Sequence, residues 1–283
     1  MPPLNYSAAT DKGLSRDNNE DTYYAGPDVG VWVVADGMGG HEAGEVASAI
    51  VRDSIKQQIQ SQSSLSQAIE NSHKAILEAV KHGVGAPGMG STVVALRSRQ
   101  TEYEVAWVGD SRAYLWTFKP DGGSLEQLTL DHSYVQMLVD TGAISASDKN
   151  QHPDRNVITQ CLGSQELKNV RVDQVHGVWE KDQWIILCSD GLTDELSDEI
   201  IARILCESRS PKDAVAKLLQ AALDSGGSDN ITIQVVESPL TKRHFYMAIT
   251  DWLPELTGNS SLDFSLYSLA LASFGLLCYW LLG

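Results

Sequence analysis

Four aspartates of this sequence stand where short apolar runs begin or end: Asp36, Asp110, Asp190 and Asp229. Three of them have a neighbouring glycine, which lets the backbone approach a bound ion closely. Packed strands hold their ends rigidly, so carboxylates carried there can converge on one point. Carboxylates brought together repel one another unless a cation neutralises them. Ligation by oxygen alone points to Mg²⁺ or Mn²⁺ rather than zinc.

Each Asp-Gly pair also has a plain interpretation as a turn, because both residues are common in turns. Four such placements, together with a further acidic cluster at Asn19-Glu20-Asp21, favour the metal interpretation over coincidence. From residue types and spacing alone, the prediction is a carboxylate-rich site for divalent metal ions.

The acids are carried by segments with strand and helix patterns. Short β-branched and aromatic runs predict strands at 31–35, 92–96, 104–108, 113–116, 184–188 and 231–236. Apolar residues at every third or fourth position predict helices near 46–59 and 65–80. A third helix should begin at Ser210-Pro211 and end at Gly226-Gly227. Without a strict strand–helix–strand alternation, these elements favour an α+β layer fold with antiparallel sheets.

The overall composition excludes several classes of protein. The chain has 283 residues and a formal net charge of −16, from 37 acidic and 21 basic residues. A protein this acidic repels phosphate backbones, which argues against nucleic acid as a partner. The four cysteines lie far apart without a C-x-x-C pair, and the N-terminus has no secretory apolar region. We therefore expect a protein of the reducing cytoplasm, without disulfides or structural zinc.

Six short motifs lie along residues 5–237: RDNNED at 16–21, VADGMGG at 34–40, GMGST at 88–92, VGDSR at 108–112, SDGLTD at 189–194 and SDNIT at 228–232. In these motifs and their order, the sequence resembles the metal-dependent type 2C protein phosphatases in their bacterial form. The resemblance implies an αββα sandwich of two antiparallel sheets flanked by helices over residues 1–238, with a flap subdomain at about 131–174. It also implies hydrolysis of phosphoserine and phosphothreonine in proteins by a water that two metal ions activate.

The same resemblance implies a set of metal ligands. Asp36 would bridge two Mg²⁺ or Mn²⁺ ions, and the backbone carbonyl of Gly37 would ligate one of them. Asp190 and Asp229 would hold the other ion. Asp110 would bind a third, weaker ion that it shares with Asp190.

Further residues would act around these ions. Glu20 and Asp21 would act through bound waters, and Arg16 would bind the substrate phosphate through its guanidinium group. Animal members carry a histidine directly after the Asp-Gly pair, to protonate the leaving alkoxide, where this sequence has Met38. His41 is the nearest candidate for that general acid, and the alternative is a loop histidine bonded to the backbone.

Two motifs suggest other classes of protein, but their context is wrong. Residues 83–88 match G-x-G-x-x-G by letter, yet they follow a helix and lead into a strand, the reverse of a dinucleotide site. Ser111 is flanked almost as in a nucleophile elbow, yet it leads into the strand at 113–116 where a serine hydrolase needs a helix. A third alternative is a catalytically weak, phosphoprotein-binding relative tethered to the membrane. The presence of Arg16 and all the carboxylates favours the enzyme.

The C-terminal part differs in composition from the rest. Residues 239–264 resemble a linker with an amphipathic stripe over 245–256, and residues 265–283 carry no charge. A helix over this last stretch would be roughly 28 Å long, close to the hydrocarbon thickness of a bilayer. We expect it to anchor a cytoplasmic catalytic domain to the inner membrane, the alternative being a helix packed on the domain or on a partner chain. Expected partners are phosphorylated proteins and a cognate serine/threonine kinase.

Overall fold

The computed structural model describes residues 4–40, 43–61, 63–120, 122–167 and 169–240. All elements described below belong to one unit, Met1–Thr241, while residues 242–283 fall into a second unit that lies outside the described residues. The predicted apolar helix at 265–283 and nearly all of the predicted linker at 239–264 are therefore not described. Within the described part of the chain, no helix is long and apolar enough to cross a membrane.

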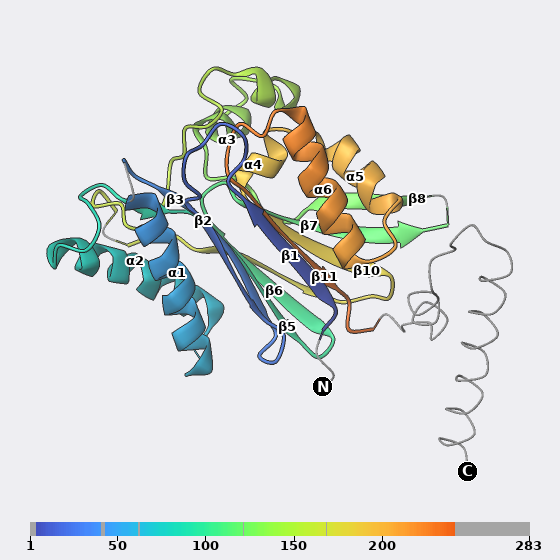
Figure 1. Ribbon diagram of the computed structural model, residues 1–283, viewed down its shortest axis with the longest axis horizontal. Coiled ribbons are helices and arrows are strands. Elements are labelled where there is room, and N and C mark those ends of the chain that lie inside the picture. The colour runs from blue at the N-terminus through green and yellow to red at the C-terminus, as the bar shows by residue number, and fades with distance from the viewer. Residues whose placement is uncertain (1–3, 41–42, 62, 121, 168, 241–283) are drawn as a thin grey trace, which may run out of the picture. The chain divides into compact units, whose positions relative to one another are not determined.

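Two antiparallel sheets form the middle of this unit (Figure 1). The first sheet has the order β1 (Tyr6–Asp11), β11 (Ile231–Glu237), β10 (Gln183–Cys188), β7 (Arg112–Lys119) and β8 (Gly122–Gln127). The second has the order β2 (Asp21–Gly26), β3 (Val31–Met38), β5 (Val93–Arg99), β6 (Glu102–Val108) and β9 (Asp173–Val178), with the two-residue β4 (Gly90–Ser91) paired to β3. The first sheet thus makes neighbours of β1 and β11, which lie far apart in the sequence.

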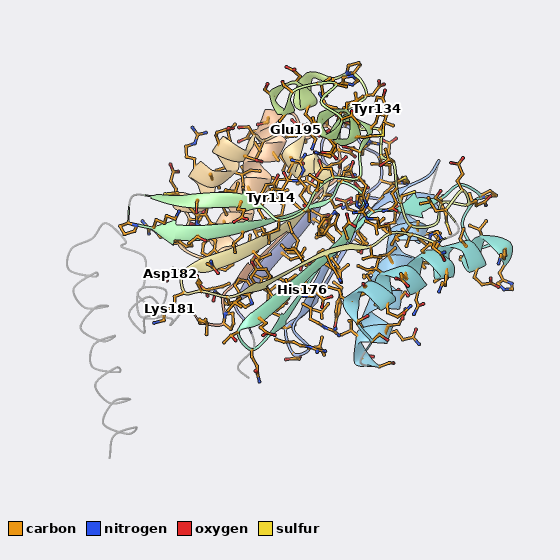
Figure 2. All side chains as sticks on the ribbon, turned by 180° about the vertical axis from the view of Figure 1, so that it is seen from behind. Tyr114, Tyr134, His176, Lys181, Asp182 and Glu195 are labelled. Carbon is orange, nitrogen blue, oxygen red and sulfur yellow. The ribbon has the colours of Figure 1, made fainter. Side chains whose placement is uncertain are left out.

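A pair of helices covers the outer face of each sheet (Figures 1 and 2). The pairs are α1 (Ala43–Gln60) with α2 (Leu65–Lys81) on the second sheet, and α5 (Asp198–Cys206) with α6 (Pro211–Ser225) on the first. One apolar cluster lies under each helix pair, and a third cluster joins residues such as Val34 of β3 to Ile185 of β10 between the sheets. This αββα arrangement confirms the predicted fold class.

The strands that the sequence predicted are those whose residues are mostly buried. All six predicted strands are present, and each supplies buried side chains to the apolar clusters. Five strands were not predicted. One is the two-residue β4, and the other four, β1, β2, β8 and β9, are the edge strands of the two sheets, with most of their residues half-buried or exposed. The predicted third helix is α6, where the Ser210 hydroxyl accepts a hydrogen bond from the backbone N–H of Asp213 at 3.2 Å.

The segment predicted as a flap connects β8 to β9 and contains α3 (Tyr134–Asp140) and a short 3₁₀-helix, η1 (Ala146–Gln151). Figure 1 shows this segment, coloured green to yellow, at the end of the sheets near the short helix α4 (Asp190–Thr193). An isolated β-bridge from Leu162 to Ser91 ties its later part to β4. The flap therefore stands over the strand ends from which the predicted site residues come.

Candidate active site

Asp36 lies near the end of β3, directly opposite Asp21 at the start of β2 in the register of the two strands. The backbone N–H of Asp36 donates to the Thr92 hydroxyl at 3.2 Å, and the Thr92 N–H donates to the Asp36 carbonyl at 2.8 Å. Asp21 is buried, and its Oδ2 accepts a hydrogen bond from the Ser189 hydroxyl at 2.6 Å. The other carboxylate oxygen of Asp21, Oδ1, is buried without any hydrogen-bond partner in the described residues.

Asp190 is brought to the same place by the end of β10. It is the first residue of α4, and the preceding residue, Ser189, forms two hydrogen bonds with Thr232 of β11. The Ser189 N–H donates to the Thr232 carbonyl at 3.1 Å, and the Thr232 N–H donates to the Ser189 hydroxyl at 3.0 Å. These bonds fix Asp190 beside the segment that carries Asp229, directly before β11.

Asn230 attaches the loop at 12–20 to the start of β11. Its side-chain amide donates to two backbone carbonyls of that loop, each at 2.9 Å, and its Oδ1 accepts the N–H of Glu20 at 2.7 Å. The loop thereby brings Arg16 against Asp229, with Nη2 of Arg16 at 2.6 Å from Oδ2 of Asp229. The Arg16 side chain remains 53% exposed, so its guanidinium group is also accessible to a ligand. Asn230 has no predicted role, although it lies inside the SDNIT motif.

Asp110 follows β6 in a turn that neighbouring side chains hold. The N–H of Gly109 donates to Nδ1 of His132 at 3.1 Å. The hydroxyls of Ser111 and Thr92 are 2.7 Å apart, so Thr92 contacts both the Asp36 and the Asp110 segments. Asp110 therefore has a defined position relative to Asp36.

The two motifs that suggested other classes of protein, at 83–88 and around Ser111, lie between the elements that the sequence predicted. Ser111 is buried and leads directly into β7, which is not the strand-to-helix turn of a nucleophile elbow. Residues 83–88 form the connection from α2 to β4 rather than the strand-to-helix turn of a dinucleotide site.

The clustered carboxylates raise one another's pKa. Burial, followed by the charges of the four other aspartates already described, raises the pKa of Asp36 well above its ordinary range. Burial and then Asp110 do the same for Asp190. Burial is also the main reason why the pKa of Asp21 and that of Asp110 are each raised to about 6. The protein groups of the site thus supply too little positive charge for all of these carboxylates to be ionised together.

The donor set fits a hard divalent cation, because it consists of carboxylates and includes the unpartnered Oδ1 of Asp21. However, no three His, Cys, Asp or Glu side chains within the described residues are grouped closely enough to hold a metal ion. One of the predicted ligands, Asp229, pairs with Arg16. The individual ligand assignments, including the Gly37 carbonyl, remain predictions.

Of the two remaining predicted residues, Glu20 lies within the described part of the chain and His41 does not. Glu20 lies beside the cluster, where its carboxylate contacts Gly44 at the start of α1, and its carbonyl accepts the Gly37 N–H at 3.1 Å. Burial is the main cause of the raised pKa of Glu20. His41 lies outside the described residues, so its role as general acid stays a prediction.

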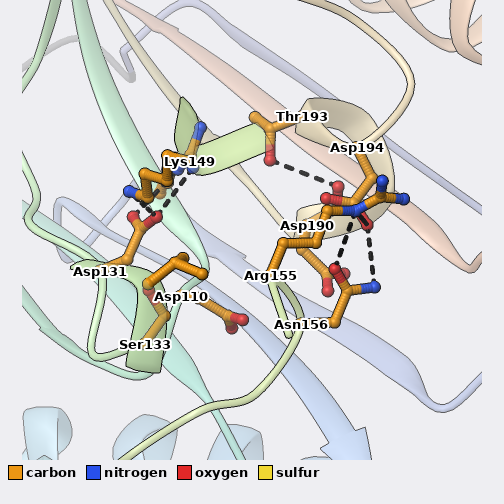
Figure 3. Close-up of a pocket in the computed structure, with 11 residues that line it drawn as sticks. Asp110, Asp131, Ser133, Lys149, Arg155, Asn156, Asp190, Thr193 and Asp194 are labelled. Carbon is orange, nitrogen blue, oxygen red and sulfur yellow. Dashed lines mark hydrogen bonds and ion pairs between the residues drawn. The ribbon is translucent and has the colours of Figure 1, made fainter. Parts of the chain in front are cut away.

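A small, open pocket lies between Asp110, Asp190 and the flap (Figure 3). Its other lining residues are Arg112, Asp131, Ser133, Val135, Lys149, Arg155, Asn156, Thr193 and Asp194. None of these nine lining residues has a role predicted from the sequence. Arg112 and Asp194 could have been noticed, because each is the last residue of a family-like motif.

Comparison with known proteins supports the same assignment. The sequence profile described as protein phosphatase 2C matches residues 9–136. The serine/threonine phosphatase Stp of Listeria monocytogenes is 34% identical over 247 residues, which cover 83% of this chain and 96% of that protein. The chain belongs to the protein phosphatase 2C family. The serine/threonine protein phosphatase PstP of Mycobacterium tuberculosis is 35% identical over 240 residues, and this chain spans only 45% of its length.

Solved structures of the 2C family have the same fold. The catalytic domain of PstP, in complex with two manganese ions, superposes with a TM-score of 0.72 at 33% identity. The match covers 83% of this chain and 98% of that domain. Because these relatives are named as phosphatases, the comparisons do not favour the catalytically weak binding protein considered above.

Proposed function

We propose that this member of the 2C family hydrolyses phosphoserine and phosphothreonine in proteins, using two Mg²⁺ or Mn²⁺ ions. The observation that supports this most strongly is the convergence of strand-end aspartates from distant motifs. Asp36, Asp190 and Asp229 come from three separate strand ends, and the charge of Asp229 contributes to the raised pKa of both Asp36 and Asp190. In a family whose members include a two-manganese structure, this cluster is best explained as a binuclear site.

The proposed ligands are Asp36, the Gly37 carbonyl, Asp190 and Asp229, with Asp110 and Asp190 holding a third, weaker ion. When bound, the ions would lower the pKa of a water so that it can attack phosphorus as hydroxide near neutral pH, and they would neutralise charge on the phosphoryl oxygens. The attacking group is then water, so no phosphorylated side chain of the protein is needed.

Asp21 has a supporting role in this proposal. Its Oδ2 is fixed by the Ser189 hydroxyl, whereas its buried Oδ1 has no partner among the described residues. A buried acceptor of this kind is costly unless it receives a hydrogen bond. We therefore assign Oδ1 to orienting a water inside the site, and we assign Glu20, on the other side of the cluster, the same kind of role.

Arg16 is proposed to bind the substrate phosphate. Its guanidinium group is half exposed and already pairs with one anion, Asp229, at 2.6 Å. A phosphate dianion offers the same planar fork a stronger partner. Binding of the phosphate would draw Arg16 away from Asp229 and leave Oδ2 of Asp229 available as a ligand.

His41 is the proposed proton donor to the leaving alkoxide. Met38, which occupies the place of the animal histidine, has no acidic proton, so the donor must be another group or water. This assignment rests on the sequence alone, since His41 lies outside the described residues.

A phosphopeptide assay tests the proposed reaction. Phosphate release from a phosphothreonine peptide should require Mn²⁺ or Mg²⁺, stop in EDTA, and fall at least about a thousandfold in Asp36→Asn, which keeps the shape but removes the charge. Asp53→Asn provides the matched control, because this exposed carboxylate pairs with Arg52 on the surface of α1. Full turnover by Asp36→Asn in EDTA would refute the metal-dependent mechanism.

We also propose that residues 265–283 anchor the protein to the inner membrane, with the catalytic unit in the cytoplasm near a kinase and its phosphorylated substrates. The support is the uncharged sequence of that stretch. After cell fractionation, the full chain should sediment with membranes and resist carbonate extraction. Release of the full chain by carbonate would refute the anchor without affecting the phosphatase assignment.

A further inference from the structure

A lysine of the flap contacts a buried aspartate beside the active site. Lys149 belongs to η1, and its ammonium group donates to Oδ2 of Asp131 at 2.8 Å and to Oε1 of Gln136 at 2.9 Å. The Lys149 side chain is only 16% exposed, which is unusual for a lysine in a surface segment. Figure 3 shows this contact on one side of the pocket.

Asp131 is itself fixed firmly to the core. Its side chain is 3% exposed, and both of its oxygens accept hydrogen bonds from Arg112 of β7, at 2.9 and 2.7 Å. The side-chain amide of Gln127 also donates to Oδ1 at 3.1 Å. Paired charges in such a buried position have a defined geometry. Lys149 therefore connects η1 to a rigid part of the first sheet.

The rest of η1 offers little else to hold it. Ala146, Ser147 and Asp148 are exposed, and a 3₁₀-helix of six residues is not stable by itself. The hydrogen bonds of Ser145 with Asp148 close the helix start locally without joining it to the core. Among the described side chains of η1, that of Lys149 makes the ion pair that joins this helix to Asp131. The loop before η1 is held separately, by backbone hydrogen bonds from Ala143 and Ile144 to the carbonyl of Leu138.

On the opposite side of the pocket the side-chain contacts are weaker, although backbone hydrogen bonds from Tyr134 to Val157 and from Thr159 to His132 also hold this part of the flap. There the Asn156 side-chain amide donates to Asp194 at 3.1 Å, and Arg155 lies 3.9 Å from the same carboxylate with a side chain that is 49% exposed. Exposed ion pairs contribute little. Figure 3 shows the two contacts on either side of Asp110 and Asp190. Lys149 thus makes the stronger of the two side-chain attachments of the flap residues that line the pocket, which are here called the flap wall.

We propose that Lys149 is a positioning residue for phosphoprotein substrates: through Asp131 it fixes the flap wall of the pocket beside Asp110 and Asp190. This inference rests on the proposed phosphatase function. A peptide chain that leaves the metal site across this pocket would contact the wall, whereas a small phosphate ester would not reach it. Loss of Lys149 should therefore weaken peptide binding and leave the chemistry at the aspartates unchanged.

The variants that test this are Lys149→Met, which keeps the length of the side chain without its charge, and Lys149→Arg, which keeps the charge. Lys81→Met is the matched control, because Lys81 is an exposed lysine paired with Glu78 on the surface of α2. Amide hydrogen exchange reports the attachment of residues 141–157 without any need for turnover. Steady-state kinetics with a phosphothreonine peptide and with p-nitrophenyl phosphate, both in Mn²⁺, report its effect on substrates.

In Lys149→Met, we expect exchange at 141–157 to accelerate about tenfold and the peptide KM to rise about tenfold, with kcat for both substrates and KM for p-nitrophenyl phosphate within about twofold of the unaltered protein. Lys149→Arg should restore most of the peptide KM, and Lys81→Met should change nothing. Unchanged exchange in Lys149→Met would refute the attachment. An equal loss with both substrates would refute the positioning role. If even the unaltered protein released no phosphate, the proposed function would fail, and exchange alone would decide the attachment.

Discussion

Individual carboxylates of this site are held in positions that are unfavourable without a counter-charge. Asp21 and Asp36 face each other across two strands, and Asp21 leaves one buried oxygen unpaired. The hydrogen bond from Ser189 compensates only the other oxygen. The folded protein thus maintains repulsion that a cation would relieve, and this has a measurable consequence for stability.

Stability of the metal-free protein should depend on pH through these acids. The pKa of Asp110 is about 6 in the folded protein, against an ordinary value of 3.8, mainly because of burial. Between these values the folded state binds more protons than the unfolded state, so this group's contribution to stability falls as pH rises from about 4 to about 6 and stays low above. Each pKa unit corresponds to about 1.4 kcal/mol. In EDTA, urea unfolding of the unaltered protein should show this loss.

Asp110→Asn is the control for that prediction. Buried His73 and His132 have a lowered pKa because of burial, and they act in the opposite direction by adding stability as pH rises toward 6.5. The informative quantity is therefore the difference between the two proteins. On going from about pH 5 to about pH 7 in EDTA, the unaltered protein should lose more stability than Asp110→Asn, by about 1–3 kcal/mol. Equal changes in both proteins would contradict the raised pKa.

Arg16→Ala should separate phosphate binding from metal binding. Because a charge-assisted contact to phosphate is lost, KM for a phosphopeptide should rise about ten- to a hundredfold. Manganese affinity, measured by calorimetry, should change much less, since Arg16 is not a ligand. Arg16→Lys should recover only part of the loss, because an ammonium group lacks the planar fork. If calorimetry instead shows the main loss in metal affinity, the role of Arg16 is to hold Asp229.

At the scale of elements, sequence alone predicts the parts that are buried or carry the acids. The strands with apolar runs and the acids at their ends, such as Asp36 after 31–35, are recognisable because burial and charge leave a local pattern. The edge strands are not recognisable from the sequence, because their half-buried residues leave no such local pattern. Contacts such as Lys149 with Asp131 or Ser189 with Asp21 depend on how loops meet in space, and no spacing along the chain encodes them.

The junction between β3 and α1 should tolerate no side chain at Gly37. A Cβ at this position would overlap the backbone carbonyl oxygen of Gly44 and lie 2.8 Å from that of Glu20, and neither backbone atom can move independently of its element. Gly37→Ala should therefore destabilise the protein by about 3 kcal/mol and displace the segment that carries Asp36. Gly40→Ala is the control, because no atom of the described residues lies within 4 Å of its added Cβ. Equal unfolding midpoints for the two variants would contradict this close packing.

We expect the unit Met1–Thr241 to be active without residues 242–283. The packing of its last residues determines where this unit ends. Leu240 packs on the apolar cluster between the sheets, and the Ser238 N–H donates to the Gln183 carbonyl at 2.9 Å. A protein ending at Thr241 should keep the peptide kcat/KM of the full chain within about twofold. One ending at Ser238 lacks Leu240 and should be less stable by about 1–2 kcal/mol. Loss of activity in the longer truncation would show that residues 242–283 contribute to the site.

The pairing of β1 with β11 has a consequence for how this domain can be reused. Asp11 lies opposite Ile231 near the acids, and Tyr6 lies opposite Val236 at the other end of the same two strands, about 17 Å away at the usual rise per residue. The described chain thus enters and leaves the sheet at one end, away from the candidate site. Additional sequence at either end need not cross the site, which makes the domain portable between proteins. Its occurrence as nearly all of the Listeria phosphatase and as less than half of the mycobacterial one agrees with this modularity.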